Sequence, residues 1–239
     1  MNIVLRKLLL LASKPAEESL PEELHECLRE ATLTLGFNLF SLGHQQGLPM
    51  SSPRFTWVSN YPKSWTEHYL KTGYLKIDPR FERAKQGKVL FMWDEALFAK
   101  HAQLWEDLKA HDLHQGFSLT ITDQQPGFSI LSLVRVGGGA LCEEEIKEKQ
   151  SHLQCLAKLS HDIVRSLVLK QQLKKLPSLT EREVEVFQWT ADGKSAQDIA
   201  DILELSKNTV DFHIKNTVKK LNVPNKTAAV LRAAFWGLL

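Results

Sequence analysis

All three tyrosines of this 239-residue chain lie within the stretch NYPKSWTEHYLKTGYLKIDP, residues 60–79. Tyr61, Trp65 and Tyr69 follow one another at four-residue intervals, which places them on one face of a helix or at its entry. Aromatic rings that carry polar donors suit an amphiphilic ligand with an apolar tail and a polar head. Such a stripe is also common in plain cores, but the nearby Asp78 favours a binding site, because an acid is unusual in a core.

Catalytic and metal chemistry has little support in the sequence. The three cysteines (Cys27, Cys142 and Cys155) are far apart, and the nine histidines show no metal-ligand spacing. The glycine run 137–139 lacks a phosphate-binding pattern. A lactone-hydrolysing enzyme, with Asp78 and a histidine activating water, is the enzymatic alternative, but no nucleophile–base motif supports it. We expect a binding protein without metal or cofactor, and not an enzyme.

Alternating helices and strands must position the aromatic stripe. Pro62 at the first position and Gly73 at the stop predict a helix over 62–73. The remaining pattern predicts a short amphipathic helix at the start of the chain, helices over 21–36, 101–113 and 141–175, and strands over 37–43, 55–60, 116–123 and 127–136, the last two joined by a hairpin turn. This is the pattern of an α+β chain whose N-terminal domain is an α/β/α sandwich with an antiparallel sheet.

The end of the chain contains helix signals only. Thr180 and Glu183 predict a capping box, and Ser195 with Asp198 predicts a second one. A longer helix over 207–223 follows, Pro224 ends it, and a fourth helix closes the chain. Two short helices joined by a tight turn, the second one longer, form a helix-turn-helix. The expected organisation is a first domain over 1–170, a linker over 171–177, and a four-helix domain over 178–239.

Positive charge gathers on the longer helix, although the whole chain carries only +2. Around this helix the local net charge is +4, from Lys207, Lys215, Lys219, Lys220 and Lys226 against Asp211. Charge on one helix face is typical of phosphate contacts. A solvated lysine face on an ordinary helix bundle is the alternative.

Residues 179–233 resemble the DNA-binding domain of the LuxR/FixJ class. The matching positions are Glu183, Trp189, Gly193, Ile199, Ala200, Thr209, Val210, His213, Lys220, Leu221 and Lys226. The resemblance implies a third helix that enters the major groove, and a homodimer that binds an inverted repeat of double-stranded DNA.

The same resemblance implies which residues of this helix face DNA. They are Lys207, Asn208, Thr209, Asp211, His213, Lys215 and Lys219. Thr209, Lys215 and Lys219 are the expected backbone or base contacts, and His213 has a structural or phosphate-facing role. Asp211 departs from the usual basic or neutral residue: an acid repels phosphate but can accept from a cytosine amino group.

The N-terminal stretch resembles the autoinducer-binding domain of LuxR-type receptors for N-acyl-homoserine lactones. Besides the aromatic stripe and Asp78–Pro79, the resemblance includes Trp93, Gly116 and Ser132. It implies that Trp65 donates to the lactone carbonyl and Asp78 accepts from the ligand amide. It further implies that Tyr61 and Ser132 donate to the acyl carbonyl, and that Tyr69 and Trp93 form the walls.

Two residues of the stretch fall outside this pattern. Tyr74 lies off the face shared by the other tyrosines and is expected to pack in the core. Arg80 stands where relatives often carry a small or β-branched residue. Pointing inward, it could pair with Asp78 or select a polar acyl substituent; we expect it to point outward. A buried Asp78 that depended on the ligand for a partner would leave the domain poorly stable without ligand.

Together the two resemblances imply a cytoplasmic quorum-sensing transcription factor. It would bind an N-acyl-homoserine lactone, bind DNA as a homodimer, and act with RNA polymerase, with no membrane partner. The alternative is an orphan regulator of the same type that responds to a non-self or non-lactone small molecule, and Arg80 is the residue that hints at it.

Overall fold

A computed structural model describes residues 2–13, 20–49, 52–122, 127–174 and 178–239. The chain divides into two units, Met1–Leu167 and Val168–Leu239, and each is described by itself. The predicted hairpin turn and the last three residues of the predicted linker lie outside the described residues. The domain limits drawn from the sequence therefore stay a prediction.

A five-stranded antiparallel sheet forms the centre of the first unit, with the order β2-β1-β5-β4-β3. Its strands are β1 Leu39–Gln46, β2 Phe55–Ser59, β3 Leu90–Met92, β4 Gly116–Thr122 and β5 Gly127–Val134. The register places Ser132 of β5 directly between Ser41 of β1 and Ser118 of β4. Three hydroxyls thus lie abreast on the middle strands.

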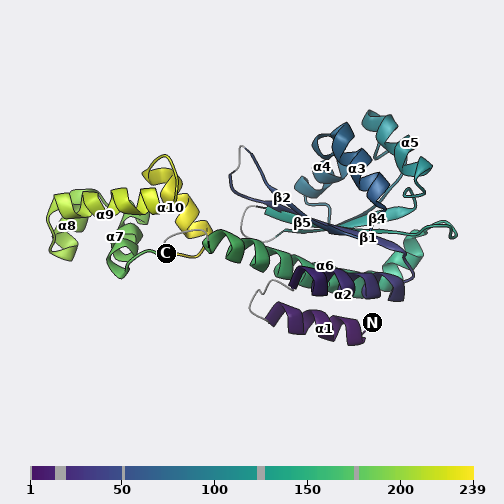
Figure 1. Cartoon of the computed structure of the whole chain (residues 1–239), viewed down its shortest axis with the longest axis horizontal. Helices are drawn as coiled ribbons and strands as arrows, with labels where there is room; N and C mark the ends of the chain where they lie inside the picture. Colours follow the sequence, from purple (N-terminus) through teal and green to yellow (C-terminus); the bar gives the residue numbers. More distant parts are fainter. Residues whose placement is uncertain (1, 14–19, 50–51, 123–126, 175–177) are drawn as a thin grey trace. The chain divides into compact units, whose positions relative to one another are not determined.

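Helices cover both faces of this sheet. They are α1 Asn2–Ser13, α2 Leu20–Thr34, α3 Lys63–Thr72, α4 Pro79–Lys85, α5 Ala102–Ala110 and α6 Glu143–Leu173, with 3₁₀ turns η1 Tyr74–Lys76 and η2 Ala99–His101. Figure 1 shows α1, α2 and the start of α6 on one side, and α3, α4 and α5 on the other. The predicted α/β/α sandwich is confirmed.

The ends of α3 and α4 are set by their sequence. Gly73 ends α3 in the left-handed conformation (φ 77°), as the sequence predicts. Pro62 is the N-cap of α3 and not its first helical residue, so that expectation was wrong by one position. Asp78 is the N-cap of α4, where its side chain accepts from the Arg80 N–H, and Pro79 follows at the first helical position. The Asp–Pro pair therefore starts a helix as well as facing the site.

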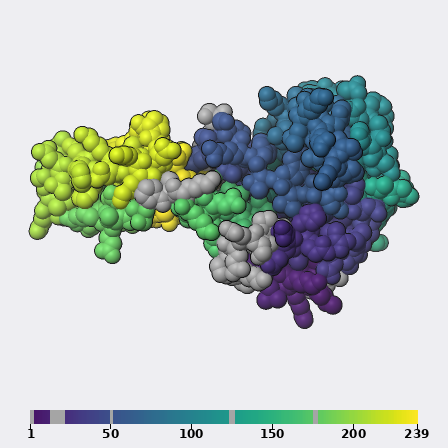
Figure 2. All heavy atoms as spheres, viewed as in Figure 1, coloured from purple at the N-terminus to yellow at the C-terminus, as the bar shows by residue number. Residues whose placement is uncertain are grey.

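The second unit contains the four predicted helices, α7 Glu181–Ala191, α8 Ala196–Leu203, α9 Lys207–Lys220 and α10 Lys226–Phe235. Both predicted capping boxes are present, at Thr180 and at Ser195. Val210 of α9 is fully buried against Ile199 of α8, which fixes the helix-turn-helix pair. Figure 2 shows this unit as one body, coloured green to yellow.

Candidate ligand-binding site and nucleic-acid interface

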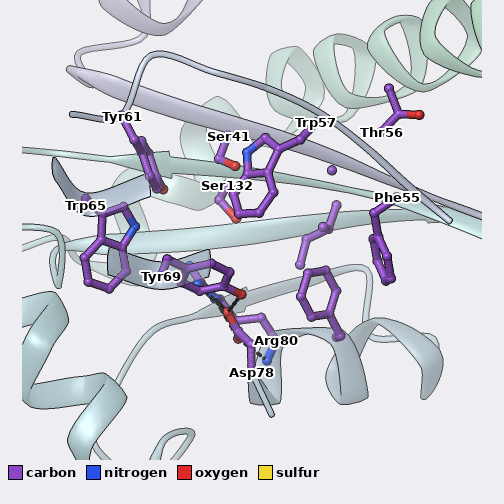
Figure 3. A pocket seen from close by; sticks show the side chains of 13 residues that line it. Ser41, Phe55, Thr56, Trp57, Tyr61, Trp65, Tyr69, Asp78, Arg80 and Ser132 are labelled. Carbon is purple, nitrogen blue, oxygen red and sulfur yellow. Dashed lines mark hydrogen bonds and ion pairs between the residues drawn. The ribbon is translucent and has the colours of Figure 1, made fainter. Parts of the chain in front are cut away.

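Five of the six residues expected to bind a ligand line one pocket of the first unit (Figure 3). They are Tyr61, Trp65, Tyr69, Asp78 and Ser132. The pocket holds about 460 Å³ of unfilled space, including the part open to solvent at its mouth.

Aromatic rings form the wall of the pocket. Trp65 and Tyr69 project from one face of α3 and are each 1% exposed, and Tyr61 lies just before the helix. The ring of Trp57, on β2, stands edge-on to Tyr69 with centroids 5.5 Å apart. Phe55, which also lines the pocket, belongs to β2 as well. The wall therefore offers the large apolar surface that an acyl chain needs.

Asp78 is buried at the polar side of the pocket and is fully engaged by protein donors. Its Oδ2 accepts from the Tyr69 hydroxyl at 2.7 Å and from Arg80 Nη2 at 2.5 Å, while Oδ1 accepts from the Arg80 backbone N–H at 2.9 Å. Arg80 Nε lies 2.9 Å from each carboxylate oxygen. Burial, and then the charge of Asp78, raise the pKa of Tyr69 well above its ordinary value, so this hydroxyl stays a donor.

Arg80 points inward, contrary to the expectation from sequence. It is 7% exposed, and its guanidinium lies 4.4 Å from the centroid of the Trp93 ring. Burial alone lowers the pKa of Arg80, but the Asp78 carboxylate more than offsets this, and the net pKa is raised. The cation is held because an anion and an aromatic face enclose it. Asp78 therefore has a built-in partner, and the reason to expect poor stability without ligand falls away.

Trp93, the sixth residue expected to bind the ligand, lies outside the pocket lining and contacts Arg80, which belongs to that lining. Its side chain is buried. Its Nε1 donates to the Ser118 hydroxyl at 2.9 Å, and Ser118 is hydrogen-bonded to Ser132 at 2.9 Å. A Cβ on Gly116 would lie 2.7 Å from the Trp93 ring, so glycine leaves the space that the indole fills. Trp93 thus positions both Arg80 and Ser132.

Two buried donors of the pocket have no hydrogen-bond partner among the described residues. They are the Tyr61 hydroxyl and the Trp57 Nε1. Burial raises the pKa of Tyr61, so its hydroxyl remains protonated. Since an unpaired buried donor is costly, both groups suit a ligand that brings acceptors. Sequence reasoning did not include Trp57, although an indole on the strand before the aromatic stripe was a usable signal.

Tyr74 packs away from the pocket, as expected. It is 3% exposed, and its hydroxyl donates to Asp107 at 2.6 Å. Burial and this hydrogen bond raise its pKa to about 12.

The residues expected to face DNA all belong to α9, but they do not share one face. Lys207, Asn208, Lys215 and Lys219 are exposed, whereas Thr209, Asp211 and His213 are half-buried. With Val210 and Thr217 buried, helical geometry places Asn208, Lys215 and Lys219 on the opposite stripe. Phe212, which sequence reasoning missed, lies on the same stripe and is 60% exposed. We call Asn208, Phe212, Lys215 and Lys219 the α9 stripe.

Not every lysine of the positive cluster is available to a ligand. Lys220 donates to Glu183 at 2.6 Å and to the Ser178 carbonyl at 3.0 Å, so it ties α9 to the start of α7. Lys207 pairs with Asp211 at 3.0 Å, which offsets the charge of the unusual acid. The charge directed outward is therefore smaller than the +4 of the sequence and is carried by the exposed Lys215, Lys219 and Lys226.

The described residues hold neither a cluster of metal ligands nor a helix that could span a membrane. No three metal-ligating side chains come together in the ranges that the structure describes. None of the helices in those ranges is both long and apolar enough to cross a membrane.

Both units match known families. A model described as the autoinducer binding domain matches residues 21–164, and a model described as bacterial regulatory proteins of the luxR family matches residues 177–233. The quorum-sensing regulator RhlR of Pseudomonas aeruginosa is 32% identical over 89% of this chain and 88% of its own. The regulatory protein SdiA of Escherichia coli is 31% identical over 93% of this chain and 92% of its own.

Solved structures of E. coli SdiA have the same fold. One crystal structure superposes with a TM-score of 0.80 at 30% identity, covering 98% of this chain and 97% of SdiA. Another, in complex with octanoyl-rac-glycerol, gives a TM-score of 0.78 at 29% identity, covering 99% of this chain and 95% of SdiA.

Taken with the fold and the two sites, these matches define a transcription factor with an autoinducer-binding domain and a helix-turn-helix DNA-binding domain. The chain belongs to the LuxR family of quorum-sensing transcriptional regulators. The family consists of regulators and not of enzymes, which confirms the expectation from the sequence.

Proposed function

We propose that the autoinducer of this regulator is an N-acyl-homoserine lactone that binds in the pocket between α3 and the sheet. The observation that carries the proposal is the meeting of the aromatic stripe, Asp78 and Ser132 around one pocket. Its polar side offers hydrogen-bonding groups for a head group, and its aromatic wall offers apolar surface for a chain.

The proposed roles follow from where each side chain lies. The Trp65 indole donates to the lactone carbonyl, and Tyr61 and Ser132 donate to the acyl carbonyl. The unpartnered Tyr61 hydroxyl supports this assignment. The ligand amide faces Asp78, and Tyr69 forms the wall. Trp93 acts through Arg80 and Ser132, because it does not reach the pocket.

The second unit is proposed to bind an inverted repeat of DNA as part of a homodimer. In this arrangement the α9 stripe enters the major groove, with Lys215 and Lys219 at phosphates or bases. Lys207, Thr209, Asp211 and His213 lie beside the stripe and would contact the backbone at its edges. The same proposal places the protein in the cytoplasm, with RNA polymerase as a partner.

A second candidate keeps the DNA-binding function but changes the ligand. SdiA has been solved with octanoyl-rac-glycerol, an acyl ester that is not a lactone. Arg80, buried beside the pocket, is the feature of this chain that favours an unusual ligand. An orphan regulator that responds to a non-lactone or foreign molecule would fit this feature.

Thermal unfolding against a panel of N-acyl-homoserine lactones, from butanoyl to dodecanoyl, tests the proposal. A ligand at a hundredfold excess over its Kd stabilises the folded protein by about 2.7 kcal/mol, which raises the Tm by several degrees. We expect such a shift for a limited range of chain lengths, and its loss in Trp65→Ala. No shift with any lactone, in a folded protein that binds DNA, would favour the second candidate.

A further inference from the structure

The hydrogen-bonding capacity of Asp78 is already filled by this chain. A carboxylate offers about four acceptor positions on its two oxygens. Four protein hydrogens point at them: the Arg80 backbone N–H, its Nε–H and one Nη2–H, and the Tyr69 hydroxyl, at donor–acceptor distances of 2.5–2.9 Å. A ligand N–H near Asp78 would therefore compete with donors that are covalently part of the site.

The groups of the pocket that lack a hydrogen-bond partner are donors, whereas the acceptors of Asp78 are filled. The Tyr61 hydroxyl and the Trp57 Nε1 are buried donors without a partner among the described residues. Figure 3 shows them on the side of the pocket with Ser132, and the Asp78–Arg80 pair on the other side. What this pocket lacks is acceptors, such as the oxygens of a carbonyl group.

From this balance we infer that the pocket recognises the acyl group through its carbonyl oxygen and does not require an amide N–H, so that it binds acyl esters about as well as acyl amides. The inference rests on the proposed function and extends its ligand class. Amides and esters share the carbonyl acceptor and differ in the N–H. A site that is built to accept an N–H rejects the ligand lacking it, because a buried acceptor is left unpaired. In this pocket Arg80 keeps Asp78 paired whether the ligand is an amide or an ester.

Arg80 is the residue that sets this tolerance. Its guanidinium is fixed between Asp78 and the Trp93 ring, so it does not depend on the ligand for its position. Replacing it by methionine keeps an unbranched apolar chain of similar length on Trp93 but removes two of the side-chain donors to Asp78. In that variant the N–H of an amide ligand can donate to the Asp78 carboxylate, whereas an ester ligand leaves this carboxylate without a replacement donor.

The test compares two ligands that differ at one atom. Each N-acyl-homoserine lactone, from butanoyl to dodecanoyl, is titrated beside the α-acyloxy-γ-butyrolactone of the same chain length. We expect the two Kd values to agree within about threefold in the wild-type protein. In Arg80→Met we expect the ester to become about tenfold or more weaker than the amide, because Asp78 loses donors. Arg83→Met, an exposed arginine of the same helix, is the matched control and should keep the wild-type ratio.

The outcomes separate this inference from the function on which it rests. Tight binding of the amide with an ester about a hundredfold weaker, in the wild-type protein, would overturn the inference and leave the lactone receptor intact. Absence of binding by every amide and every ester would overturn both. The ratio of the ester Kd to the amide Kd in the wild-type protein tests the inference even if Arg80→Met does not give soluble protein.

Discussion

The guanidinium of Arg80 stacks on the indole of Trp93, 4.4 Å from the ring centroid. The indole is itself fixed, because its Nε1 donates to Ser118 at 2.9 Å. The cation is therefore held beside Asp78 by groups of the protein itself. The protein therefore carries, within the first unit, a partner for the carboxylate that would otherwise depend on a ligand.

Arg80→Met should lower the free energy of unfolding by about 3–5 kcal/mol, because it leaves the Asp78 carboxylate buried without its cation. Adding Asp78→Asn should recover part of this loss, since no buried charge then remains. Urea denaturation of the wild type, both single variants and the double variant, without ligand, gives the coupling energy. A coupling energy below about 0.5 kcal/mol would show that Asp78 and Arg80 contribute to stability independently of each other.

The start of α6 should make the protein sensitive to acid. Glu145 accepts from Arg135 and also from Lys149, whose Nζ lies 2.5 Å from Glu145 Oε1 and 2.7 Å from the Leu35 carbonyl. The bond from Arg135, above all, lowers the pKa of Glu145 from 4.5 to about 2. Because the pKa is lower in the folded state, this contribution is complete above pH 4.5 and is lost as pH falls toward 2.

Glu145→Gln should therefore cost about 2 kcal/mol at neutral pH and flatten the dependence of stability on pH below 4.5. Urea denaturation at a series of pH values measures both effects. Glu148→Gln, an exposed residue of the same helix, is the control and should leave the curve unchanged. An equal loss at pH 3 and pH 7 in Glu145→Gln would contradict the assignment.

Lys219 and Lys220 are neighbours in sequence but should behave differently. Lys219→Met should lower DNA affinity and reduce the slope of log K against log salt by about 1, because Lys219 lies on the α9 stripe. Lys220→Met should instead loosen the contact between α9 and α7, because Glu183 loses its cation. Fluorescence anisotropy on DNA selected by the protein measures the first effect, and hydrogen exchange of the α7 and α9 amides measures the second. Equal salt slopes in the two variants would refute the distinction.

Phe212 should read thymine. An exposed aromatic ring on the α9 stripe suits apolar contact with a thymine methyl group in the major groove. Replacing thymines of the selected site by deoxyuridine, one at a time, should weaken binding by roughly threefold to tenfold at one position of each half-site. Phe212→Ala should abolish that difference. If the variant keeps the wild-type sensitivity to deoxyuridine, another residue makes the contact.

Most of the fold could be read from the sequence because its signals are local. The capping boxes at Thr180 and Ser195 and the stop at Gly73 each depend on residues within one turn of a helix. The four-residue spacing of the aromatic stripe likewise placed Trp65 and Tyr69 correctly, since both lie on one face of α3.

The contacts that complete the site could not be read in this way. The direction of Arg80 depends on the Trp93 ring, thirteen residues further along the chain and just after β3, and no local pattern reports that contact. The same holds for Ser118, which reaches Ser132 only through the register of β4 on β5. Trp57 and Phe212 were missed for a different reason: neither belongs to the four-residue spacing that marks the aromatic stripe.

The most direct test of a lactone in this pocket is a calorimetric titration of the full chain with the lactone that gives the largest thermal shift. Trp65→Phe and Trp105→Phe are titrated beside the wild type; Trp105 is buried in the same hydrophobic cluster but does not line the pocket. We expect one site per chain, an affinity about tenfold lower in Trp65→Phe through the lost indole donor, and wild-type affinity in Trp105→Phe. Equal affinity in Trp65→Phe and the wild type, or no heat of binding in any of the three, would contradict this expectation.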